Sequence, residues 1–326
     1  MTNTPNRIAF LFPGQGSQAV GMGKELAAIY PVARRTFEEA DEALGYKLSE
    51  LCFEGPEEKL KLTEITQPAI LTASVAAWRV LKEKALQEKD LKPDFVAGHS
   101  LGEYSAHVAA GTLTFADAVR TVRNRGKYMQ EAVPVGVGAM AAILGMTLDQ
   151  VSEIANEAAN DAAQEQREVC QAANINSPEQ IVISGHAGAV SRAIQLATER
   201  GAKKAVSLPV SAPFHCALMQ PAQDRLAEDL RALRFQNPSC PVVCNIDAAV
   251  ITSAEASREA LIRQVTGAVR WEPSVRLLIN QGTNLFVEVG PGKVLWGLMR
   301  QIDRSQTCAT VGDEASLHKT LAQISG

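Results

Sequence analysis

The sequence predicts an α/β protein in which a parallel sheet is covered by helices on both faces. Short apolar runs at 7–12, 93–97 and 285–289 have the length and composition of buried strands. Segments at 67–89 and 115–132 have the apolar spacing of helices, and they alternate with these runs along the chain. This alternation favours parallel pairing, because parallel strands need a long crossover connection, which is usually a helix.

A smaller unit is predicted in the middle of the chain, between Pro134 and Pro209. Its elements follow the order strand, helix, two strands, helix, strand, which is the ferredoxin-like arrangement. We therefore expect an α/β core made of residues 1–133 and 209–326, with an inserted ferredoxin-like α+β subdomain of residues 134–208. Its strands are expected at 139–144, 170–175, 180–184 and 203–208, and its helices at 148–160 and 189–200.

The composition indicates a globular protein without a surface for nucleic acid. The chain has 326 residues, 46% of them hydrophobic, and a net charge of −4. No apolar run approaches the roughly 20 residues of a membrane helix, and the short run near the start cannot form a signal-peptide core. The six cysteines form no C-x-x-C pair and no zinc-like cluster. We expect a soluble cytoplasmic protein with free thiols.

Residues 98–102, Gly-His-Ser-Leu-Gly, follow a predicted strand and precede a predicted helix. The pattern Gly-x-Ser-x-Gly in this context predicts a nucleophile elbow, a sharp turn that exposes the serine hydroxyl. Ser100 is therefore the candidate nucleophile. The backbone amide of Leu101 would lie at a helix N-terminus and face a developing oxyanion. The alternative is an ordinary turn with a serine that caps the helix.

A serine nucleophile needs a base, and neutral histidine can accept a proton near pH 7. Of the five histidines, His215 is the best candidate, because it follows a stretch with two prolines that predicts a rigid loop. His99 lies inside the elbow and His107 on the following helix, where a packed side chain is expected. His215 could also be a surface residue. Cys216, next to it, has no elbow and is expected to be a buried, inert thiol.

The glycine-rich loop at 14–19, Gly-Gln-Gly-Ser-Gln-Ala, allows two interpretations. It matches the dinucleotide fingerprint G-x-G-x-x-G/A after a strand. That fingerprint also requires an acid at the end of a second strand, whereas the acids near 38–41 lie in a helical, exposed pattern. In the other interpretation the loop lines the serine site, and Gln15 or Gln18 donates a hydrogen bond there.

Arg125 lies on the predicted helix after the elbow. If its side chain faces the serine, its planar guanidinium could bind a carboxylate through two parallel hydrogen bonds. The alternative is a solvated basic face that it shares with Arg120 and Arg123.

Together these motifs resemble one family, the malonyl-CoA:acyl carrier protein transacylases of bacterial type II fatty acid synthesis. The resemblance runs in order along nearly the whole chain. It rests on Phe12-Pro13-Gly14-Gln15-Gly16-Ser17-Gln18, Gly98 to Glu103, Arg125-Gly126-Lys127, Asn174-x-Asn176-Ser177-Pro178, Pro213-x-His215, Val269-Arg270-Trp271 and Val289 to Leu295. It implies an α/β-hydrolase-like core with an inserted ferredoxin-like subdomain.

The resemblance also implies roles for individual residues. Ser100 would be the nucleophile, His215 its base and Arg125 the ligand of the malonyl carboxylate, while the backbone amides of Leu101 and Gln15 would form the oxyanion hole. The family orients its histidine by a backbone carbonyl, which would be that of Gln264 here. That explains why no third acid is evident. Supporting positions would be Phe214, whose bulk is expected to favour malonyl over methylmalonyl, Met129 and Asn176.

The implied reaction transfers malonyl from malonyl-CoA to the phosphopantetheine thiol of acyl carrier protein, without metal or redox cofactor. The carrier would be a separate chain, because no Asp-Ser-Leu attachment motif is present. Three other functions share some of these features: a serine esterase or thioesterase, a non-catalytic protein of the same fold, and a nucleotide-dependent oxidoreductase. The sequence does not distinguish a carrier of fatty acid synthesis from one of polyketide synthesis.

Overall fold

The computed structural model describes residues 7–88, 92–160, 168–210 and 212–325. Its larger part is built on a six-stranded sheet in the order β10-β9-β1-β2-β7-β8, in which only the β7–β8 pair is antiparallel. The strands are β1 Ile8–Phe12, β2 Phe95–Gly98, β7 Val242–Val243, β8 Val250–Ile251, β9 Leu285–Val289 and β10 Thr307–Val311. The parallel α/β core predicted from the sequence is therefore confirmed.

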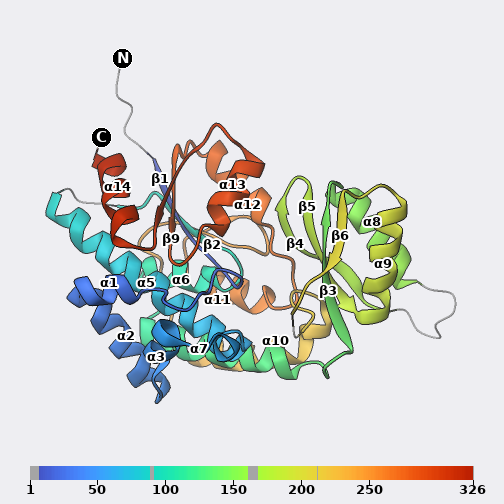
Figure 1. The fold of residues 1–326 in the computed structure, drawn as a ribbon, viewed down its shortest axis with the longest axis horizontal. Coiled ribbons are helices and arrows are strands. Elements are labelled where there is room, and N and C mark those ends of the chain that lie inside the picture. Colours follow the sequence, from blue (N-terminus) through green and yellow to red (C-terminus); the bar gives the residue numbers. More distant parts are fainter. Residues whose placement is uncertain (1–6, 89–91, 161–167, 211, 326) are drawn as a thin grey trace.

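Helices cover this sheet on both faces (Figure 1). Strand β1 shows why, since Phe10 and Phe12 pack on one face, and Ala9 and Leu11 on the other. The first face is covered mainly by α1 Lys24–Ile29, α2 Pro31–Leu44, α5 Thr63–Glu88, α6 Gly102–Ala109, α7 Phe115–Glu131, α10 Gln220–Ala232 and α14 Glu314–Ser325. The second is covered by α12 Trp271–Asn280 and α13 Val294–Ile302.

Three short helices, α3 Leu48–Glu54, α4 Glu57–Leu60 and α11 Ala254–Arg263, and the 3₁₀ turn η1 Ala217–Met219 complete this part. Helices α1 and α2 meet at Tyr30, because Pro31 lacks an N–H group and begins a new helix as its first residue. No helix of the described ranges has the length and apolarity needed to cross a membrane.

The second sheet has four strands in the order β4-β5-β3-β6, and every neighbouring pair is antiparallel. Its elements are β3 Gly138–Leu144, α8 Leu148–Ala159, β4 Cys170–Ser177, β5 Gln180–His186, α9 Ala187–Glu199 and β6 Lys204–Ser207. Helices α8 and α9 pack on it around a separate apolar core. This is the ferredoxin-like unit expected from the order of elements; the domain limits at 134 and 208 stay a prediction.

Backbone hydrogen bonds join β4 of the smaller sheet to Val269 in the larger part. Ile175 N donates to Val269 O at 2.8 Å, and Val269 N donates to Ala173 O at 2.8 Å. This bridge places β4 of the smaller sheet against the segment that precedes α12. A pocket between the two parts can therefore have a defined shape.

The elbow depends on close approach of three backbone segments. An added Cβ atom would lie 2.0 Å from Phe12 O at Gly102, and 2.0 Å from Gly102 O at Gly98. The two glycines are thus required by packing between β1, β2 and α6 rather than by a left-handed conformation. Ser100 itself takes the left-handed conformation, with φ 50°.

We expect Gly102→Ala to lower the free energy of unfolding by about 2–3 kcal/mol, because the methyl group would force the elbow helix away from β1. The measurement is chemical denaturation followed by circular dichroism. Gly297→Ala in α13 is the matched control, since nothing lies within 4 Å of its Cβ position, and it should be neutral or slightly stabilising. Equal losses in the two variants would contradict the packing explanation.

Candidate active site

A pocket of about 520 Å³ lies between the core and the smaller sheet. The core contributes the loop after β1, the elbow and one face of α7, and the smaller sheet contributes β3 and β4. Its lining residues are Gln15, Gly16, Gln18, Lys61, Gln67, His99, Ser100, Arg125, Met129, Met140, Asn174, Leu208, Pro209, Val210, Phe214 and His215. The loop at 14–19 is therefore part of the serine pocket, as the second interpretation of its glycines expects.

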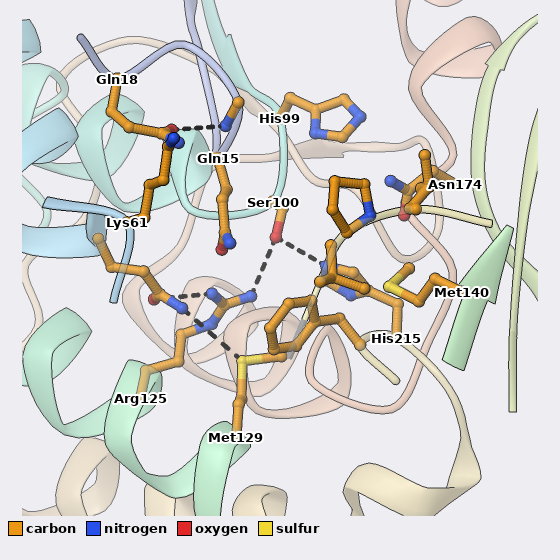
Figure 2. A pocket seen from close by; sticks show the side chains of 16 residues that line it. Gln15, Gln18, Lys61, His99, Ser100, Arg125, Met129, Met140, Asn174 and His215 are labelled. Atoms are coloured by element: carbon orange, nitrogen blue, oxygen red, sulfur yellow. Dashed lines mark hydrogen bonds between the residues drawn. The ribbon is translucent and has the colours of Figure 1, made fainter. Parts of the chain in front are cut away.

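Ser100 and His215 form a hydrogen-bonded pair at the base of this pocket (Figure 2). The distance from Ser100 Oγ to His215 Nε2 is 2.7 Å. On the other side of the ring, Nδ1 lies 2.9 Å from Gln264 O and 3.2 Å from Gly267 O. Because carbonyl oxygens only accept, Nδ1 must carry the proton, and Nε2 is left free to accept the serine proton. Two backbone carbonyls thus orient the histidine where many hydrolases use an acid.

The environment keeps His215 neutral. Burial lowers its pKa from 6.5 to about 3, and the nearby positive charge of Arg125 acts in the same direction. A buried neutral imidazole beside a serine hydroxyl is suited to accept a proton from it. Cys216 is also buried, and burial raises the pKa of its thiol, so this neighbour remains a protonated thiol.

Arg125 faces the pocket and not the solvated side of α7 (Figure 2). Its Nη1 donates to Gln67 Oε1 at 2.9 Å, and its Nη2 donates to Gln264 Oε1 at 3.0 Å and to Ser100 Oγ at 3.1 Å. All three acceptors are neutral. Within the described parts of the chain, no carboxylate lies within 4 Å of this guanidinium. Its charge is thus available to a carboxylate that enters the pocket.

The peptide of Ser100 is held at both of its polar groups. Its N–H donates to Asn245 Oδ1 at 2.7 Å, and its carbonyl accepts from Gln264 Nε2 at 2.9 Å. Asn245 Nδ2 in turn donates to Gly98 O at 2.7 Å. These contacts stabilise a conformation that a serine rarely adopts.

The other expected residues occupy different positions around the pair. Gln15, Met129 and Phe214 line the pocket, and Leu101 is buried behind the serine. Asn176 does not line the pocket, but its Oδ1 lies 2.8 Å from Nε2 of the pocket residue His99. In the described residues, no acceptor is found for the backbone amides of Gln15 and Leu101. Their roles in catalysis stay predictions.

Three contributors to this arrangement were not predicted from the sequence: Gln67, Asn245 and the carbonyl of Gly267. Gln67 had a possible signal, since it is a polar residue at the beginning of an alanine- and leucine-rich helix. Asn245 lies 145 positions from Ser100, and no local pattern marks it. Only the fold brings it to the elbow.

Comparison with known proteins gives relatives of the same length. A model of the acyl transferase domain matches residues 9–321. The malonyl CoA-acyl carrier protein transacylase of Bacillus subtilis (strain 168) is 50% identical over 319 residues, which cover 98% of each chain. The enzyme of that name from Escherichia coli (strain K12) is 48% identical over 315 residues, 97% of this chain and 99% of its own.

Solved structures agree with these matches. The malonyl CoA-acyl carrier protein transacylase from Coxiella burnetii superposes with a TM-score of 0.93 at 44% identity, over 99% of each chain. A malonyl-transacylase solved in complex with a type II polyketide acyl-carrier protein has a TM-score of 0.92 at 46% identity, over 97% of this chain and 99% of its own. Because both the domain match and these relatives span nearly its whole length, this chain belongs to the acyl transferase family, among the malonyl CoA-acyl carrier protein transacylases.

Proposed function

We propose that this acyltransferase moves the malonyl group of malonyl-CoA to the phosphopantetheine thiol of a separate acyl carrier protein, through a malonyl ester on Ser100. The observation that carries the proposal is the position of Arg125. A buried guanidinium with neutral partners only 3.1 Å from the nucleophile favours an acyl group that ends in a carboxylate. The relatives from Bacillus subtilis and Escherichia coli, which are named for malonyl CoA, point to the same substrate.

In the first half-reaction, Ser100 Oγ attacks the thioester carbonyl carbon while its proton passes to His215 Nε2. The carbonyl oxygen becomes an oxyanion, and the unpaired backbone amides of Gln15 and Leu101 are the proposed donors to it. The carbon–sulfur bond then breaks. Coenzyme A leaves as a thiol with the proton from His215, and the malonyl ester remains on Ser100.

In the second half-reaction, the carrier thiol gives its proton to His215 and attacks the ester carbonyl carbon. The bond to Ser100 Oγ breaks, and the serine regains the proton from His215. Throughout, Arg125 binds the malonyl carboxylate and so aligns the carbonyl with the serine. Each step conserves atoms and charge among the chain, coenzyme A and the carrier thiol. The reaction therefore requires no redox partner.

The carrier as a partner is supported by the relative that was solved in complex with a type II polyketide acyl-carrier protein. A reducing, cytoplasmic compartment is part of the proposal as well, since all six cysteines are free thiols and five of them are buried.

The acyl-enzyme is the direct test of this function. Incubation with malonyl-CoA, without carrier, should add one malonyl group to the chain, visible by intact-mass spectrometry and mapped to Ser100. Ser100→Ala should remain unmodified. Addition of holo carrier protein should then remove the group from the wild-type chain. Rapid release of malonate to water, with no acyl-enzyme and no transfer, would indicate a hydrolase instead.

Arg125→Ala should reduce acylation by malonyl-CoA roughly 10- to 100-fold, since a charged hydrogen bond to the carboxylate is lost. Acylation by acetyl-CoA, which has no carboxylate, should change much less. The rates are measured by single-turnover mass spectrometry with each thioester. Arg120→Ala is the control, because Arg120 lies on the same helix but is exposed and paired with Asp117. Equal losses with both thioesters would contradict carboxylate recognition.

The pH dependence of acylation should reflect the neutral state of His215. With its pKa lowered to about 3, the free base persists as the pH falls, so the second-order rate constant should stay flat from pH 8 to pH 5.5. An ordinary imidazole would lose about tenfold at pH 5.5 through protonation. Stopped reactions at each pH, with circular dichroism to verify folding, provide the measurement. A decline centred near pH 6.5 would be incompatible with a buried neutral base.

A further inference from the structure

A buried carboxylate contacts the residues that hold the nucleophile. Three acidic side chains of the described ranges are buried: Asp41, Glu103 and Glu288. Asp41 accepts hydrogen bonds from Ser49, and Glu288 accepts the backbone amides at the start of α13. Glu103 lies in the first turn of the elbow helix and is the only one of the three that contacts residues of the active site.

One oxygen of Glu103 joins the two residues that hold the Ser100 peptide. Its Oε2 accepts from Asn245 N at 2.9 Å and from Gln264 Nε2 at 2.8 Å. Asn245 accepts the N–H of Ser100, and Gln264 donates to its carbonyl. Glu103 therefore supports both hydrogen bonds that stabilise the left-handed serine.

Glu103 also determines which way the amide of Gln264 faces. A carboxylate accepts hydrogen bonds, and a guanidinium only donates them. Gln264 lies between the two, so its NH₂ must face Glu103 and its oxygen must face Arg125. The opposite orientation would set donor against donor at Arg125. The backbone carbonyl of Gln264 also accepts from His215 Nδ1, so this one residue contacts the nucleophile, the base and the arginine.

We propose that Glu103 is a positioning residue. It acts as a hydrogen-bond acceptor for Gln264 and Asn245, and so holds Ser100, His215 and Arg125 in their positions relative to one another. It touches neither substrate nor reacting atoms and acts through its two partners. This inference rests on the proposed function, because it is the acyl transfer at Ser100 that Glu103 would support.

The acceptor, rather than the negative charge, is the property that this role requires. Burial raises the pKa of Glu103 to about 7, so both forms of the carboxyl are populated near neutral pH. Oε1 has no hydrogen-bond partner among the described residues, and His107 Nε2 lies 3.9 Å from it. A proton on Oε1 leaves Oε2 able to accept from Gln264 and Asn245. Glu103→Gln can keep the same acceptor, with its amide nitrogen on the side of the neutral His107.

The experiment compares Glu103→Gln and Glu103→Ala with wild type. The reactive fraction is counted by mass spectrometry after malonyl-CoA addition, and single-turnover rates per reactive site are measured with malonyl-CoA and acetyl-CoA. Glu103→Gln should stay within about threefold of wild type. Glu103→Ala should lose roughly 10- to 100-fold per site with both thioesters, and more with malonyl-CoA, because Arg125 is displaced as well.

Glu288→Ala is the matched control, since Glu288 is a similarly buried acid that accepts two backbone amides at the start of α13 and does not line the pocket. It should lower Tm but leave the rate per site within about twofold. If Glu103→Ala does not fold, Glu103→Met, which fills the space without an acceptor, takes its place.

Gln264→Met removes the intermediate side chain but keeps the carbonyl for His215. Combined with the Glu103 variant, it should cause a loss clearly smaller than the product of the two single losses, because Glu103 acts in part through Gln264 and in part through Asn245.

Three results would overturn the inference. Glu103→Ala, or Glu103→Met, with a normal rate per site would make Glu103 merely structural. A loss in Glu103→Gln as large as in Glu103→Ala would show that the charge matters. Multiplicative effects with Gln264→Met would show that Glu103 does not act through Gln264. By contrast, a wild-type chain that malonyl-CoA leaves unlabelled would refute the proposed function itself.

Discussion

The left-handed peptide of Ser100 is the constraint on which the rest of the site depends. A non-glycine residue at φ 50° costs about 1–3 kcal/mol and persists only where its surroundings over-determine it. Here β1, β2 and α6 approach so closely that only glycine fits at 98 and 102. Asn245 and Gln264 then take both polar groups of the serine peptide. The hydroxyl is thereby presented to the pocket in one orientation.

Burial lowers the pKa of both functional side chains next to this serine, but only the histidine loses its charge near neutral pH, because the pKa of a guanidinium starts far higher. It favours the neutral form of His215, which is the form that accepts a proton. Arg125 remains charged, and in a medium of low polarity its charge acts strongly on any anion that enters the pocket. The same desolvation thus provides a base and an anion-binding group within a few ångströms. A neutral set of acceptors around Arg125 makes this arrangement possible.

The smaller sheet completes the pocket rather than the catalytic pair. Ser100, His215 and Arg125 all belong to the core, whereas Met140 and Asn174 come from the smaller sheet. The backbone bridge between β4 and Val269 fixes the distance between these walls. That bridge lies close in sequence to Gly267, whose carbonyl faces His215, so one short segment both contacts β4 and orients the base.

The sequence by itself determined the local features of this protein. Apolar runs predicted the strands, the order of elements predicted the ferredoxin-like unit, and Gly-x-Ser-x-Gly between strand and helix predicted the elbow at Ser100. These follow from periodicity and turn chemistry, which act over a few residues. The tertiary structure alone decided that Arg125 faces inward, that Asn245 and Gln67 complete the site, and that Glu103 accepts hydrogen bonds from its members. Such contacts join residues 58 to 161 positions apart, and no local pattern records them, because they exist only once the core has packed.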